Sequence, residues 1–162
     1  DAQQLWEQGH AEGSISEPPL PLRIAGTGPC DENLKARIAF LKLQTVEVLG
    51  SLDRSGLRAA LSRAKFTVLP SECYENGPMA ALESLASGVP LVGTDLGGIP
   101  EMIQDGVNGV IVPARAPKEF LQGLLRVTTL PDAGTSARQW AEKSASRTDH
   151  MRRLISIFES TA

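Results

Sequence analysis

The sequence predicts an α/β fold with an open, Rossmann-like parallel sheet and helices on both of its faces. Short apolar runs of four or five residues alternate with segments of helical spacing along most of the chain. Runs without an alternating polar face are typical of strands that are covered on both sides. The chain has 162 residues, and a domain of globular proteins has about 150. We therefore expect residues 1–162 to form one domain.

Five apolar runs predict the strands. The first ends at Gly26, the second at Gly50 and the third at Pro70, all of which interrupt a strand. The fourth begins at Pro90, and the fifth is closed by Pro113. In chain order the expected strands cover residues 22–25, 45–49, 66–69, 90–94 and 109–112.

Segments of helical spacing lie before, between and after these runs. Leu34, Ile38 and Leu41 fall on one helical face. Asp53 or Ser55 is suited to cap the helix after the second strand. In chain order the expected helices cover residues 2–9, 33–43, 56–64, 78–87, 100–104, 117–128, 135–143 and 148–160.

Composition disfavours several functional classes. The 16 Lys and Arg against 19 Asp and Glu give a net charge of −3, so we expect no nucleic-acid partner that binds a basic surface. Cys30 and Cys73 cannot form a disulfide framework, and no His/Cys cluster has zinc spacing, so we expect no metal site and a cytoplasmic location. No apolar run approaches the roughly 20 residues of a membrane helix.

Ligands of open parallel sheets bind beyond the carboxyl ends of the strands. Four strand-to-helix turns are expected there, at residues 26–29, 50–52, 70–79 and 95–98, and each contains glycine. Glycine lets a ligand approach the backbone closely, although it is also an ordinary turn residue. Together these turns favour an anionic or nucleotide ligand.

The turn after the third strand carries the most information. Pro78 has no N–H and fits the first turn of a helix, which makes Asn76 or Gly77 the expected cap. The free amides of Met79 and Ala80 would then form an anion site suited to phosphate.

Two glutamates flank this helix start. Glu83 lies four residues beyond Met79, on the same face of the helix. Its carboxylate suits a ribose diol because it accepts two hydroxyl donors at once. Glu75 precedes the helix at the rim of the pocket and suits sugar hydroxyls in the same way. The spacing of two glutamates proves nothing by itself, and the ordinary alternative for Glu83 is an exposed helix glutamate.

Several ordered motifs around these glutamates resemble the signature of the family 4 retaining glycosyltransferases. The segment from Glu75 to Glu83 leads into Ser87-Gly88-Val89-Pro90 and the fourth strand, and Gly97-Gly98-Ile99-Pro100-Glu101 follows. The upstream stretch at residues 24–29 and the downstream stretch at 105–113 continue the match. The resemblance covers residues 22–113 closely and the helical tail loosely.

The resemblance implies a GT-B enzyme, in which two Rossmann-like domains face a cleft. This chain would be the donor-binding second domain, with the amino-terminal acceptor domain and the first strand absent. By position Glu75 would be the catalytic residue that holds donor-sugar hydroxyls, and it is not expected to be a covalent nucleophile. Glu83 would hold the ribose diol, and the Met79 amide together with Gly77 would meet the diphosphate.

The rest of the implied site comes from the earlier turns. The backbone from Gly50 to Leu52 would lie against the nucleobase, and Gly26 and Gly28 would line the same cleft. The resemblance implies no metal, because helix amides and basic side chains neutralise the diphosphate. No cofactor is expected either, since the nucleotide-diphosphate sugar is itself a substrate. The implied reaction is transfer of a hexosyl group to an acceptor hydroxyl with retention, in polysaccharide or glycoconjugate biosynthesis.

The chain departs from the family at two points. The family usually has an Arg and a Lys just before the helix that begins here near Ala2, and neither can be assigned because the sequence starts after that point. The family also often has glycine where Pro78 stands. We therefore expect the isolated chain to bind donor weakly and to transfer little sugar. The acceptor, a sugar or a lipid-linked sugar, would bind the absent domain, and peripheral membrane contact is left open.

Two other classes of protein stay open on the sequence. One is a nucleotide-sugar epimerase or phosphorylase domain of similar fold, and the other is a non-catalytic nucleotide-binding module. A dinucleotide dehydrogenase fits less well, because Gly26-Thr27-Gly28-Pro29 has no third glycine at the required offset.

Overall fold

The computed structural model describes residues 1–160 and alternates strands with helices as the sequence predicts. The strands are β1 (Leu22–Ala25), β2 (Val46–Gly50), β3 (Thr67–Leu69), β4 (Leu91–Thr94) and β5 (Gly109–Val112). The helices are α1 (Ala2–Ala11), α2 (Asp31–Phe40), α3 (Arg54–Leu61), α4 (Met79–Ala86), α5 (Ile99–Met102), α6 (Pro117–Val127), α7 (Ala133–Ser144) and α8 (Arg147–Ser160).

All strand pairs are parallel, which confirms the predicted fold class, but the strands form two sheets. β1 pairs with β2, and β3, β4 and β5 form a second sheet in that order. Among the described residues no strand joins β1 to β3. The predicted parallel strands are therefore present, but in the described residues they form two separate sheets.

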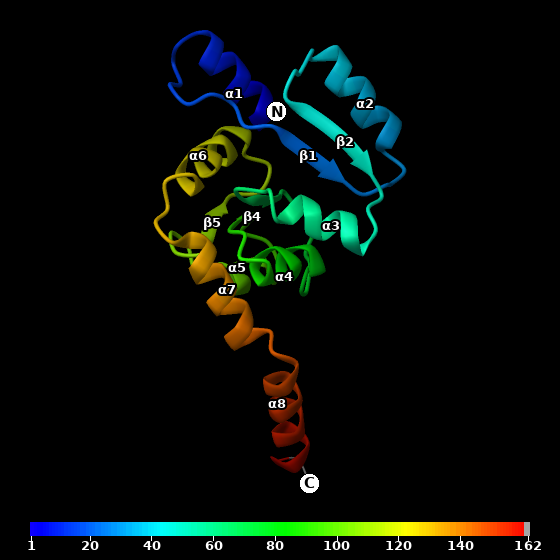
Figure 1. Ribbon diagram of the computed structural model, residues 1–162, viewed down its shortest axis with the longest axis vertical. Coiled ribbons are helices and arrows are strands. Elements are labelled where there is room, and N and C mark those ends of the chain that lie inside the picture. Colours follow the sequence, from blue (N-terminus) through cyan, green and yellow to red (C-terminus); the bar gives the residue numbers. More distant parts are fainter. Residues whose placement is uncertain (161–162) are drawn as a thin grey trace.

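The β3–β4–β5 sheet lies between two layers of helices (Figure 1). Leu91 of β4 belongs to one core cluster with buried residues of α4, α5 and α7. Val92, the next residue, belongs to the other cluster, with Trp6 of α1 and the apolar face of α6. Successive side chains of a strand point to opposite faces, so a strand that is buried at every position separates two cores.

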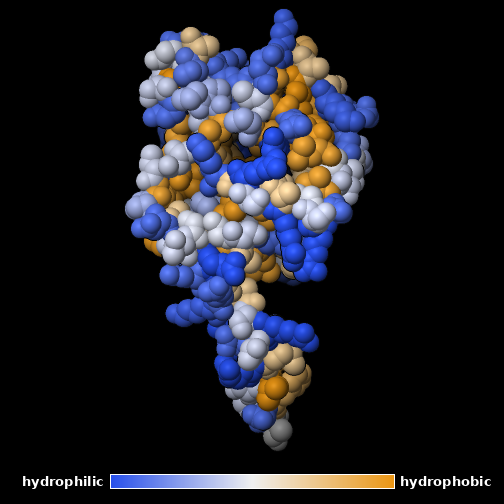
Figure 2. All heavy atoms as spheres, in the orientation of Figure 1, coloured by the Kyte–Doolittle hydropathy of each residue, from blue (hydrophilic) through white to orange (hydrophobic). Residues whose placement is uncertain are grey.

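The β1–α2–β2 unit is less buried than the rest of the chain. None of residues 21–50 is buried, and the expected apolar face of α2, with Leu34 and Ile38, is half-exposed. A shallow groove of about 590 Å³ lies between α2 and β2 and is lined in part by Val46 and Val48. Apolar side chains are visible over β1 and β2, and the surface is hollowed on the side of β1 that faces β4 (Figure 2).

Helix boundaries follow local capping. Asp53 caps α3, as expected, and its Oδ1 accepts a 2.7 Å hydrogen bond from the Gly56 amide. This bond and one from the Ser55 hydroxyl lower the pKa of the Asp53 carboxyl from its ordinary value. The helix after β1 begins at Asp31, two residues before the expected start, and ends before Lys42, whose φ of 52° breaks the helix.

The last helix, α8, extends away from the rest of the molecule (Figure 1). None of its residues is buried, and Met151, Leu154 and Ile155 are exposed. Within residues 1–160, no helix has the length and apolarity that crossing a bilayer requires.

Replacing Trp6 with Ala tests the packing of α1 on the sheet. The side chain is 1% exposed, and its Nε1 donates a 3.0 Å bond to the Glu17 carbonyl. We expect W6A to lower the free energy of unfolding by about 3–5 kcal/mol, through cavity formation. Urea denaturation measures this. The control F40A, at a side chain 83% exposed, should change it by less than about 0.5 kcal/mol.

Candidate functional site

The start of α4 differs from the expected one by one residue. Pro78 is the N-cap, with φ −65° and ψ 120°, and the helix begins at Met79. The expectation that Pro78 lies in the first turn, capped by Asn76 or Gly77, is therefore wrong. Extended backbone at Pro78 lets its carbonyl accept from the Ala81 amide at 3.0 Å, so Pro78 begins the helical hydrogen bonds from outside the helix.

The tip of α4 is open to solvent. Met79 is 64% exposed, and Ala80 is also exposed. Their amides are the first two of the helix and have no acceptor inside it. No atom lies within 4 Å of where a Cβ on Gly77 would stand. The tip can therefore accept an anion without moving packed side chains.

The opposite face of α4 holds the helix in place. Ala81 and Leu85 are completely buried against the sheet, whereas Glu83 is exposed on the other side. The buried Ser84 hydroxyl donates its one hydrogen to the Val89 carbonyl at 2.9 Å. In the 2.5 Å bond between Ser84 and Thr67 the Thr67 hydroxyl is therefore the donor. The Glu83 side chain is thus exposed to solvent on a helix whose opposite face is buried.

Glu75 is held by its own loop and by the turn after β4. The Ser71 hydroxyl donates to Glu75 Oε1 at 2.5 Å, and the Gly98 amide donates to the Glu75 carbonyl at 2.6 Å. The Thr94 hydroxyl donates to the Ser71 carbonyl at 2.9 Å. The half-buried Glu75 therefore has both its backbone and its carboxylate fixed.

Sequence reasoning missed Ser71 and Thr94 as parts of this arrangement. Gly97 and Gly98 were noted only as part of a motif. The available signal was their position, since each lies at or just beyond the carboxyl end of an expected strand, where ligands of parallel sheets bind.

The remaining predicted residues lie at the carboxyl ends of β1 and β2. The Gly26 amide donates to the Gly50 carbonyl at 2.7 Å, and both glycines have positive φ, 129° and 69°. The Gly28 amide donates to Asp31 Oδ1 at 2.8 Å, and Leu52 is half-buried.

The structure thus gathers the predicted residues into two groups. Glu75, Gly77, Met79 and Glu83 belong to one loop and helix, and the glycines of β1 and β2 with Leu52 form the other group. Within residues 1–160 no hydrogen bond or ion pair joins these groups.

Charged side chains of the loop before α4 and of the turn after β4 have partners near the end of β5. Glu72 forms an exposed ion pair with Arg115, at 3.1 Å, and Asp95 Oδ1 accepts from the Ala114 amide. Such an exposed pair is worth little to stability. Within the described chain, no group of three or more His, Cys, Asp or Glu residues could hold a metal ion.

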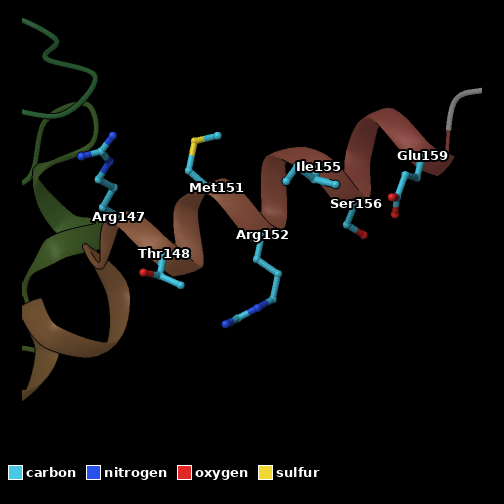
Figure 3. Close-up of a pocket in the computed structure, with 7 residues that line it drawn as sticks. All are labelled: Arg147, Thr148, Met151, Arg152, Ile155, Ser156 and Glu159. Atoms are coloured by element: carbon cyan, nitrogen blue, oxygen red, sulfur yellow. The ribbon is translucent and has the colours of Figure 1, made fainter.

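A second groove lies at the last helix, far from these residues in the sequence. A groove of about 530 Å³ follows α8, lined by one side of that helix, from Arg147 to Glu159. Its side chains spread along a helix that projects outward (Figure 3). It includes none of the predicted site residues.

The parallel α/β architecture, with open turns at the carboxyl ends of its strands, defines a Rossmann-like domain. The sequence model of the glycosyl transferases group 1 family matches residues 10–129. The chain therefore belongs to this family.

Individual relatives are similar over most of this chain. The chain is 34% identical over 122 residues to an exopolysaccharide phosphotransferase from Streptomyces coelicolor, which covers 74% of this chain and 13% of that protein. It is 31% identical over 149 residues to the putative colanic acid biosynthesis glycosyltransferase WcaL of Salmonella typhimurium. This match covers 85% of this chain and 37% of WcaL. The chain thus spans well under half the length of these relatives.

Solved structures show the same fold. TarM superposes with a TM-score of 0.80 at 20% identity, over 97% of this chain and 31% of that one. Anabaena HepE, solved in complex with UDP-glucose, superposes with a TM-score of 0.73 at 19% sequence identity. The superposition covers 96% of this chain and 46% of that one.

The variant S84A tests how α4 is anchored. It removes the acceptor of the Thr67 hydroxyl and leaves the Val89 carbonyl without its donor. We expect the free energy of unfolding to fall by about 1–3 kcal/mol, as measured by urea denaturation. S87A, which removes an exposed hydroxyl from the end of the same helix, is the control. An equal loss in both variants would contradict this account.

Proposed function

We propose that this chain is the donor-binding domain of a family 4, retaining GT-B glycosyltransferase. In the proposed reaction a hexosyl group passes from a nucleotide-diphosphate sugar to an acceptor hydroxyl. The observation that supports this proposal is the start of α4, where exposed amides are flanked along the chain by Glu75 and Glu83.

The diphosphate would bind at the tip of α4. The amides of Met79 and Ala80 would donate to phosphate oxygens, and the helix dipole would add about 0.3–1 kcal/mol. The missing side chain of Gly77 would let a phosphate come close to the backbone.

The two carboxylates would bind the two sugars of the donor. Glu83 would accept two hydroxyls of the ribose, and Glu75 would accept hydroxyls of the transferred sugar. Hydrogen bonds to a charged group contribute about 1.5–3 kcal/mol each. Glu75 is the proposed catalytic residue because it would position the reacting sugar.

The glycines at the ends of β1 and β2 would receive the nucleobase. No atom lies within 4 Å of a Cβ placed on Gly26 or Gly50, so a flat ring could approach the backbone there. Gly28 would line the same side, and Leu52 would offer an apolar contact.

The proposed chemistry depends on stabilising the leaving diphosphate. Negative charge develops on it as the acceptor hydroxyl attacks the same face of the sugar, and fixed dipoles and cations lower that barrier. Arg115 is engaged with Glu72, so we propose that further cations come from other parts of the polypeptide. The sugar or lipid-linked acceptor would also bind there, and residues 1–162 alone would transfer little sugar. The proposed reaction uses no metal and no cofactor.

Two of the similar proteins are consistent with this proposal. HepE was solved with UDP-glucose bound, and WcaL is named for colanic acid biosynthesis. A cytoplasmic location, with peripheral membrane contact through a lipid-linked acceptor, belongs to the same proposal. The free, exposed thiols of Cys30 and Cys73 support a reducing compartment.

We also propose that one further parallel strand of the same polypeptide lies between β1 and β3. Doubly wound sheets have the strand order 3-2-1-4-5-6, and the order found here is β2–β1 and then β3–β4–β5. A single added strand would join the two sheets and give that order. It would also cover the half-exposed residues of β1 and β3.

Backbone direction supports the added strand. The Leu22 amide donates to the Thr45 carbonyl just before β2, and the Gly26 amide donates to Gly50 of β2. The amides of Arg23 and Ala25 therefore point to the other edge of β1. The Thr67 amide donates to the Pro90 carbonyl beside β4, so the Val68 amide points to the free edge of β3. Sheet edges left unpaired in this way attract another strand.

Amide hydrogen exchange tests this added strand. In a longer natural polypeptide that contains this chain, the amides of Arg23, Ala25 and Val68 should exchange at least about tenfold more slowly than in residues 1–162. The Ile24 amide, which faces β2, is the control and should be protected in both. Equal exchange of the three edge amides in both polypeptides would refute the added strand.

Glu83→Gln tests the proposed donor site. Titrations of residues 1–162 with UDP, GDP and ADP, followed by NMR, should show one diphosphate preferred. E83Q should weaken that binding by about tenfold, equivalent to about 1.4 kcal/mol. The control E119Q changes an exposed glutamate on α6. Unchanged affinity in E83Q would favour a nucleotide-binding module of another kind.

A further inference from the structure

We infer that Ser71 is a positioning residue that presents Glu75 to the donor sugar, on a rigid support formed by Thr94, Gly97 and Gly98. This inference rests on the proposed function, because it takes Glu75 to bind the sugar. The inference gives a role to residues that do not themselves belong to the proposed donor site at the start of α4.

The support is the turn that follows β4. Thr94 is 2% exposed and ends a strand that is buried at every position. The next residue, Asp95, donates its amide to the Val112 carbonyl of β5 and accepts the Ala114 amide on its carboxylate. The turn is therefore fixed to the end of β5 and to the segment that follows it before it reaches Gly97.

The glycines of this turn allow the loop before α4 to lie directly on it. A Cβ on Gly97, which has φ 58°, would stand 2.4 Å from the Glu75 carbonyl oxygen. A Cβ on Gly98 would stand 2.1 Å from the Asn76 carbonyl oxygen. Backbone thus packs on backbone, and the Gly98 amide donates to the Glu75 carbonyl at 2.6 Å. Any side chain at either glycine would displace Glu75.

Ser71 fixes the carboxylate itself. Its carbonyl is held by the Thr94 hydroxyl, and its own hydroxyl donates to Glu75 Oε1 at 2.5 Å. Within residues 1–160 no hydrogen-bond partner contacts Oε2 of Glu75. One oxygen therefore orients the group, and the other is left for a sugar hydroxyl.

A glutamate side chain has several rotatable bonds, and a ligand that orders them loses affinity. The Ser71 hydroxyl removes part of that loss before the sugar arrives. Its effect should therefore be confined to ligands that carry the sugar. A nucleoside diphosphate without the sugar should not depend on Ser71.

The experiment compares UDP with UDP-glucose, or the corresponding GDP or ADP pair if the diphosphate titrations select one of these. Dissociation constants are measured by NMR titration of residues 1–162 and, for the same variants, of a longer polypeptide that contains them. The glucose gain is the dissociation constant of the free diphosphate divided by that of the diphosphate with glucose attached. In S71A the glucose gain should fall by about fivefold or more, while the dissociation constant of the free diphosphate changes by less than about twofold. S71T keeps a hydroxyl and should restore the gain.

Two further variants separate the possible failures. If E75Q loses the glucose gain but S71A keeps it, Ser71 does not position Glu75 and the inference is wrong, while the proposed function stands. If E75Q keeps the gain, or no diphosphate binds, the proposed function fails and the inference fails with it. G98A should lose the glucose gain as S71A does, whereas S87A, a hydroxyl deletion at the far end of α4, should not.

Discussion

The burial of β4 on both faces is the constraint on which the rest of the structure depends. Leu91 packs under α4, α5 and α7, and Val92 packs under α1 and α6. Because β4 is enclosed, β3 and β5 are held in register on either side of it. Their carboxyl ends reach a common edge, and the loop that carries Glu75 meets the turn that carries Gly97 there.

The candidate site follows from how α4 divides its two faces. The completely buried Ala81 and Leu85 fix the helix on the sheet, so its first amides and Glu83 can stay in solvent without loss of rigidity. An anion-binding helix start works best when it does not move on binding, because ordering a mobile segment costs affinity. The half of the edge built by β1 and β2 lacks such an anchor, since residues 21–50 contain no buried side chain.

The sequence predicted the strands and helices more completely than it predicted how the strands pair. The strand and helix runs follow from local apolar patterns, and a glutamate on the exposed side of α4 follows from the buried positions around it. Pro78 was misplaced by one residue, because a proline is tolerated both as a cap and in the first turn of a helix. Local patterns did not predict which strands pair, because pairing joins residues that are far apart in the chain.

The sequence by itself determined the parallel α/β class and the exposed, glycine-lined turns, since both depend on side-chain patterns within a few residues. The tertiary structure alone decided that Ser71 bonds to Glu75, that Thr94 holds Ser71, and that Gly97 and Gly98 support the loop. These contacts join segments from neighbouring strands. They exist because β3 and β4 lie side by side, which only the packing of both helical layers onto one sheet brings about.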